Sequence, residues 1–153
     1  MVSGASGEAM ILRVLRKILL AILVLGMAGS GAELILLKHT EDARQWIPLI
    51  LLCAGLSVLV WHVLSGGFLA TRLLHWLMIG FIIGGGLGIY FHYLGLTEFK
   101  LESNPSLAGW DLFWQAIRGK TPPLLAPGAL IQLGLVGLVY TYKHPALSRL
   151  KGD

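Results

Sequence analysis

Charged residues are scarce in this sequence. Asp, Glu, Lys and Arg make up 13% of its 153 residues, whereas 56% are hydrophobic. Ordinary soluble domains carry about 25% charged residues, so the composition points away from a water-soluble protein. The single cysteine, Cys53, excludes an intramolecular disulfide and a paired-cysteine metal or redox motif. No hydrolase, phosphate-loop or zinc-protease motif occurs in a supporting context, so we expect neither an enzyme nor a metal site.

Four long apolar stretches separated by short polar joints dominate what is present. They are Ile18–Leu37, Ile47–Ser65, Leu73–Tyr93 and Leu125–Tyr142. Each is close to the ~20 residues that an α-helix needs to cross ~30 Å of hydrocarbon. The pattern predicts an all-α integral membrane protein whose residues 1–153 form one domain, a bundle of four transmembrane helices. The residues before these stretches are expected to form a flexible tail and then a helical stub at the head groups, with the bilayer itself as a partner.

The distribution of Lys and Arg predicts the orientation. A cytoplasmic N-terminus places seven of these residues inside and five outside, which favours both termini in the cytoplasm, most simply at a bacterial inner membrane. The net charge of +4 could suggest nucleic acid, but no basic patch lies on a polar helix face. Because the basic residues sit at the ends of the apolar stretches, lipid head groups explain them better.

The third connection carries its own helix signature. Asn104 is a suitable N-cap, Pro105 fits the first helical position, and Gly119 fits the terminator. The pattern predicts an amphipathic helix over residues 105–118, preceded by an extended segment at Glu98–Glu102. This helix either lies in the outer interface with its tryptophans against lipid or a partner, or roofs the bundle.

Tryptophans near the ends of these segments are expected to act as interface anchors. They are Trp46, Trp76, Trp110 and Trp114.

Small residues recur at helical spacing inside the spans, which lets helices approach closely in lipid. The predicted packing positions are Gly26, Ser30, Gly80, Gly84, Gly88 and Gly134. The alternative is that a flat cofactor approaches the glycine stripe of the third span.

A few polar side chains lie within the spans. Glu33 is the one acidic residue there, about 6 Å below the predicted outer surface, and it needs a partner, water or a proton. Gln132, about 10 Å into the last span, is expected to hydrogen-bond to another helix. His62 and His92 could ligate a haem or chlorophyll, although interfacial anchoring or hydrogen bonding explains a histidine there equally.

These features concern packing more than chemistry. The leading hypothesis is therefore a small accessory subunit that stabilises a larger inner-membrane assembly of integral subunits, such as an electron-transport complex. One alternative is a tetrapyrrole-carrying subunit that uses His62 or His92. Another is a small ion-coupled transporter that uses Glu33.

Overall fold

The computed structural model describes residues 2–118 and 125–148, and within these residues the fold is helical, with no strand. The long helices are α1 (Val2–Leu36), α2 (Trp46–Ser65), α3 (Phe68–Ser103) and α5 (Leu125–Thr141). The short ones are η1 (Ala43–Gln45), α4 (Gly109–Ile117) and α6 (Pro145–Ser148). Helices α1, α2 and α3 are long and apolar enough to cross a membrane, whereas α5 is apolar but has 17 residues. The protein is therefore a helical membrane protein, with three such helices in the described part of the chain.

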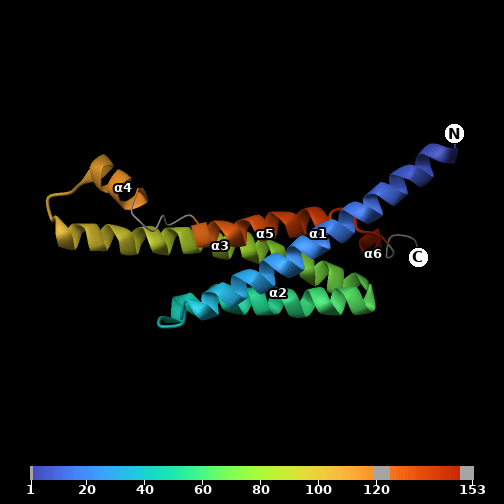
Figure 1. The fold of residues 1–153 in the computed structure, drawn as a ribbon, viewed down its shortest axis with the longest axis horizontal. Coiled ribbons are helices and arrows are strands. Elements are labelled where there is room, and N and C mark those ends of the chain that lie inside the picture. The colour runs from blue at the N-terminus through green and yellow to red at the C-terminus, as the bar shows by residue number, and fades with distance from the viewer. Residues whose placement is uncertain (1, 119–124, 149–153) are drawn as a thin grey trace.

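The four long helices form a bundle in which α1 crosses the others diagonally (Figure 1). Helix α1 contacts α2 and α5, and α3 contacts the same two helices. Residues 37–45 connect α1 to α2 at one end of the bundle, which we name the joint end. Gly66 and Gly67 connect α2 to α3 at the opposite end, the turn end, and Gly66 has φ +58°, a conformation that favours glycine. The buried core between the ends is formed by Leu23, Met27, Leu52, Leu59, Leu74, Met78, Phe81, Leu130 and Leu133.

The contact between α3 and α5 is the most extensive in the molecule, and glycines make it possible. A Cβ atom on Gly134 would lie 2.7 Å from the Met78 carbonyl oxygen, and one on Gly85 would lie 2.7 Å from the Pro127 carbonyl oxygen. Backbone atoms cannot move aside as a flexible side chain can. The two helices therefore pack at a distance that only glycine permits at these positions.

Two helices extend well beyond the predicted spans. Helix α1 begins at Val2, so the expectation of a flexible tail is wrong. Helix α3 continues to Ser103, so Glu98–Glu102 is helical and not extended. At 1.5 Å per residue, the 36 residues of α3 extend over about 54 Å, more than a bilayer core requires. Hydropathy marks the part of a helix that suits lipid, whereas the helix itself continues to the next breaking residue.

The predicted helix at 105–118 is shorter and starts later. Asn104 ends α3, and its side-chain oxygen accepts hydrogen bonds from the Ser106 backbone N–H and hydroxyl, 3.2 and 2.7 Å. Helix α4 then begins at Gly109 and lies back along the far part of α3 (Figure 1). The predicted terminator, Gly119, lies outside the described residues. Asparagine suits both an N-cap and a turn after a helix. The prediction that Asn104 is an N-cap was therefore wrong, because it lies in the turn after α3.

Candidate functional site

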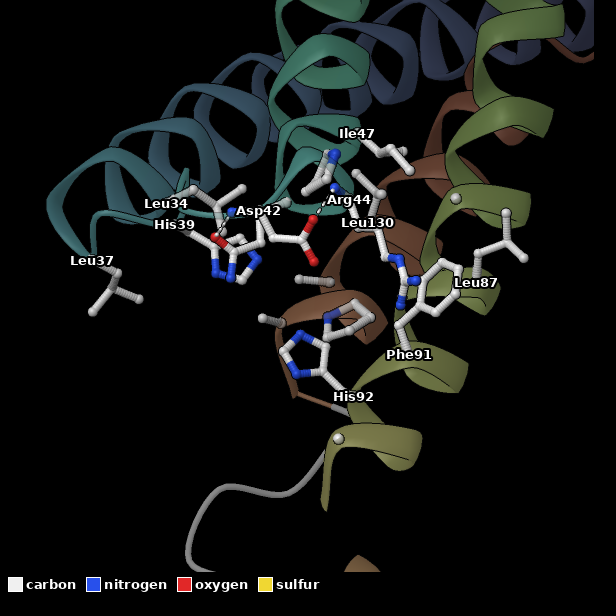
Figure 2. A pocket seen from close by; sticks show the side chains of 18 of the residues that line it. Leu34, Leu37, His39, Asp42, Arg44, Ile47, Leu87, Phe91, His92 and Leu130 are labelled. Carbon is white, nitrogen blue, oxygen red and sulfur yellow. Dashed lines mark hydrogen bonds between the residues drawn. The ribbon is translucent and has the colours of Figure 1, made fainter. Parts of the chain in front are cut away.

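A cavity of about 550 Å³ opens between the four long helices at the joint end (Figure 2). The cavity exists because α1 crosses the neighbouring helices diagonally, so that the helices are separated at this end. The deeper wall is apolar and consists of Leu34, Leu52, Leu87, Pro127 and Leu130. Gly84 and Gly88 of α3 also line it, and Ser30 borders it from α1. The volume falls in the range of roughly 300–1,000 Å³ that is typical of small-molecule sites.

The rim of this cavity is polar and charged. Its members are Glu33, His39, Asp42, Arg44, Gln45, His92 and Glu98. The joint that carries several of them is fixed by a capping box on η1. The Asp42 carboxylate accepts from the Arg44 backbone N–H at 3.4 Å, and the Gln45 side chain accepts from the Glu41 and Asp42 backbone N–H groups at 2.8 and 3.3 Å. The short polar joint is thereby held in one conformation over the opening.

Two aromatic contacts cross the rim. The guanidinium carbon of Arg44 lies 4.9 Å from the Phe91 ring centroid, a cation–π contact that links the joint to α3. The His39 and His92 rings face each other nearly in parallel, with centroids 6.0 Å apart and 11° between their planes. Figure 2 shows these side chains gathered around the opening. The arrangement places hydrogen-bonding groups above an apolar interior.

A second polar cluster lies at the turn end, around the buried ring of His62. Its Nε2 is 2.8 Å from the Tyr140 hydroxyl oxygen, and its Nδ1 is 2.9 Å from Thr71 Oγ1. Because Thr71 donates its single proton to the Gly67 carbonyl, 2.9 Å away, its oxygen accepts from His62 Nδ1–H. The neutral His62 ring therefore accepts from the Tyr140 hydroxyl at Nε2. This network joins α2, α3 and α5.

Two further contacts complete this end of the bundle. His75 Nδ1 lies 2.9 Å from Thr141 Oγ1, and Arg16 donates to the Lys143 carbonyl at 3.1 Å. His144 follows α5, and its ring centroid is 5.0 Å from that of His62. Burial, together with the neighbouring His62 ring and the positive charge of Arg16, lowers the pKa of His144 to about 4, so the ring is neutral at neutral pH. The cluster therefore connects the ends of these helices by hydrogen bonds.

The structure does not bring the two predicted cofactor histidines together. His62 lies at the turn end with both ring nitrogens hydrogen-bonded, and His92 lies exposed at the joint end beside His39. Ligation by His62 would cost one of these hydrogen bonds. Among the described residues, no group of three or more His, Cys, Asp or Glu could hold a metal ion. A tetrapyrrole at His62 or His92 therefore stays a prediction.

The predicted packing residues lie in different surroundings. A Cβ on Gly26 would meet Leu133 of α5, and one on Gly134 would meet the α3 backbone. A Cβ on Gly80 would have Leu51 of α2 at 3.7 Å, an ordinary contact, and one on Gly84 would meet the same side chain at 2.6 Å. Ser30, Gly84 and Gly88 all line the cavity.

The predicted anchors and intramembrane polar groups lie at the surface. All four predicted anchors are exposed, namely Trp46, Trp76, Trp110 and Trp114, and so is Trp61. The face of α4 that is turned inward is formed by Ala116, with Leu112 and Phe113 half-buried, and the Phe113 ring contacts Tyr93 of α3. Glu33 is exposed at the cavity rim. Gln132 is exposed on α5, and its side chain has no hydrogen-bond partner among the residues that the structure describes, so its expected bond to another helix stays a prediction.

Several residues at these sites were missed by sequence reasoning. At the turn end they are Thr71, Tyr140, Thr141 and His144, and at the joint end Arg44 and Phe91. A weak signal was present, because Tyr140, Thr141 and His144 cluster where the last span ends. Nothing local marks their partner, since 78 residues separate Tyr140 from His62.

No protein-family model, curated protein or solved structure matches this chain. Its function is therefore argued from the geometry of its own residues.

Proposed function

We propose that this chain is an accessory subunit of a larger inner-membrane complex, which it stabilises by lateral helix contact and not by catalysis. The observation that carries the proposal is the side chain of Gln132. It lies seven residues into the apolar helix α5, or about 10 Å, it is exposed, and it has no hydrogen-bond partner among the described residues. An amide that faces hydrocarbon is unfavourable unless a neighbouring protein hydrogen-bonds to it.

Outward-facing glycines support the same proposal. A Cβ on Gly29 of α1 or on Gly86 of α3 would have nothing within 4 Å. Each glycine weakens its helix by up to about 1 kcal/mol relative to alanine, and no packing inside the chain offsets this cost. A helix of another subunit that approaches closely would offset it. An electron-transport complex is one assembly that would use such a subunit.

The proposal includes a specific topology. Helix α5 is the fourth span, because its two ends lie at the joint end and the turn end of the bundle, level with the ends of α2. Its 17 residues cover about 26 Å, close to the hydrocarbon thickness. We place the turn end and both termini in the cytoplasm of a bacterial cell, with α4 and its exposed tryptophans at the outer interface.

The test is the Gln132→Leu variant in its native membrane. We expect its co-purification with partner subunits in mild detergent to fall at least about fivefold, equivalent to roughly 1 kcal/mol of association free energy. Its own melting temperature should not fall, because the amide has no partner among the described residues. Val139→Leu, at another exposed position on α5, is the matched control. A wild-type protein that purifies as a monodisperse monomer without partners would contradict the proposal.

The two alternative functions have separate tests. A tetrapyrrole at His92 requires a Soret or near-infrared band that His92→Ala abolishes, and a colourless native preparation would remove it. An ion-coupled transporter requires flux through reconstituted vesicles that depends on Glu33. Unchanged flux in Glu33→Gln would remove that hypothesis.

A further inference from the structure

We propose that the cavity at the joint end binds a zwitterionic phospholipid of the phosphoethanolamine type. In this arrangement the phosphate lies at Arg44, the ammonium group lies among the rim carboxylates, and an acyl chain occupies the apolar interior. This site is separate from the lateral contacts proposed above and does not depend on them.

The depth of the cavity matches one leaflet. Its lining along α3 runs from Gly84 to Glu98, which corresponds to about 21 Å at 1.5 Å per residue. Half of a ~30 Å hydrocarbon core is ~15 Å, and the polar head-group layer lies beyond it. The cavity therefore spans the length of a lipid from its head group into the acyl region.

The polarity of the cavity changes in the same direction as that of a lipid. At the deep end the wall consists of leucine side chains and of Gly84, and no charged side chain lines it there. At the mouth, Arg44, His92 and Glu98 replace the apolar lining. A wholly apolar ligand would leave these groups unmatched, and a small water-soluble one would leave the leucines unmatched.

The charges at the mouth favour a zwitterion over an anion. The carboxylates of Glu33, Asp42 and Glu98 surround the opening together with one guanidinium, that of Arg44. None of these four groups forms an ion pair with another residue in the described part of the chain. Arg44 stays at the opening because its guanidinium lies on the Phe91 ring. A phosphate can pair with it, and an ammonium group on the same head then meets carboxylates that would repel an anionic lipid.

The neighbouring histidines fit this head group as well. His39 and His92 face each other across the rim, and a neutral imidazole offers one donor and one acceptor. They can hydrogen-bond to phosphate and glycerol oxygens without adding charge. An isoprenoid quinone would use the same donors but would bring no cation for the three carboxylates.

The experiment is native mass spectrometry of the full chain, delipidated in detergent and then titrated with phosphatidylethanolamine, phosphatidylglycerol or ubiquinone. We expect one phosphatidylethanolamine per chain, bound at least about tenfold more tightly than phosphatidylglycerol or quinone, a difference of roughly 1.4 kcal/mol. Arg44→Gln should weaken this binding by about tenfold. Arg118→Gln is the matched control, since its guanidinium also lies over an aromatic ring, Trp114, at 4.7 Å, but does not line the cavity.

A second variant keeps the test decisive if Arg44→Gln unfolds. Glu33→Gln combined with Glu98→Gln changes two exposed side chains and removes two negative charges. We expect the ratio of the affinity for phosphatidylethanolamine to that for phosphatidylglycerol to fall at least about fivefold. Equal or tighter binding of phosphatidylglycerol or quinone by the wild type would overturn the proposal. The proposal would also be overturned if Arg44→Gln and the double variant both fold and bind phosphatidylethanolamine as tightly as the wild type does.

Discussion

At the scale of single residues, buried hydrogen bonds between side chains connect different helices of this protein. His62 uses both ring nitrogens, one toward Thr71 of α3 and one toward Tyr140 of α5. These groups lie close to the end of each helix, where a membrane interior gives way to head groups. A hydrogen bond there satisfies polar atoms that lipid cannot. Their residue types are visible in the sequence, but their pairing depends on how α5 returns along α3, and no local pattern encodes that return.

This pairing gives a prediction for the Tyr140→Phe variant. Removing the hydroxyl leaves the buried Nε2 of His62 without its donor, while the ring and its packing remain. Interhelical hydrogen bonds in membrane proteins contribute about 0.6 kcal/mol on average and up to about 1.7. We therefore expect the free energy of unfolding, measured by denaturant titration in mixed micelles, to fall by about 1 kcal/mol. Tyr142→Phe, at an exposed position two residues away, should leave it unchanged; an equal loss in both variants would assign no role to this bond.

At the scale of helices, hydropathy placed the spans better than it placed the helix ends. The span predicted at 47–65 coincides with α2 within one residue, and the one at 125–142 differs from α5 only at its last residue. Clear signals bound both spans. The span at 47–65 has the Trp46–Pro48 start and the Gly66-Gly67 turn, and the span at 125–142 has a short polar segment. Helices α1 and α3 continue past their apolar stretches through segments that include good helix formers, such as Ala9 and Met10 in α1 and Glu98 and Lys100 in α3. The cavity between them could not be predicted, because it arises from the crossing of α1.

Helix packing gives the next prediction, which concerns Gly134→Leu. The added side chain would meet the α3 backbone at Met78 and Ile82, so α5 must move away. Overpacking of this kind typically costs about 1–3 kcal/mol. We expect the melting temperature in detergent to fall clearly. Gly29→Leu serves as the control, since nothing lies within 4 Å of the added Cβ, and its stability should stay equal or rise slightly. A Gly134→Leu variant as stable as the wild type would show that α3 and α5 do not pack this closely.

At the scale of the whole molecule, the structure has two different ends. The turn end is tied together by hydrogen bonds between α2, α3 and α5, with Arg16 of α1 bonded to the backbone after α5. The joint end is open around the cavity, and α3 projects beyond it with α4 folded back on its side (Figure 1). One end therefore holds the helices in place while the other leaves room between them. An arrangement with a closed end and an open end suits a ligand that enters from one leaflet.

The difference between the two ends of the bundle also predicts which residues are accessible from each side of the membrane. In a Cys53→Ala background, single cysteines would replace Gly7 at the start of α1, Ser106 before α4, and Tyr142 after α5. All three positions are exposed in the structure. In spheroplasts treated with a membrane-impermeant maleimide, we expect labelling at position 106 alone, and labelling at positions 7 and 142 only after lysis. The reason is that α1, α2 and α3 place position 106 across the membrane from position 7, and α5 returns the chain.

Labelling of position 142 from the same side as position 106 would mean that α5 does not cross, whereas labelling of position 7 in intact spheroplasts would reverse the orientation. Four crossings with a cytoplasmic start give the expected combination, because the 17 residues of α5 then cover about 26 Å of a bilayer and Tyr142 reaches the side on which Arg16 already lies.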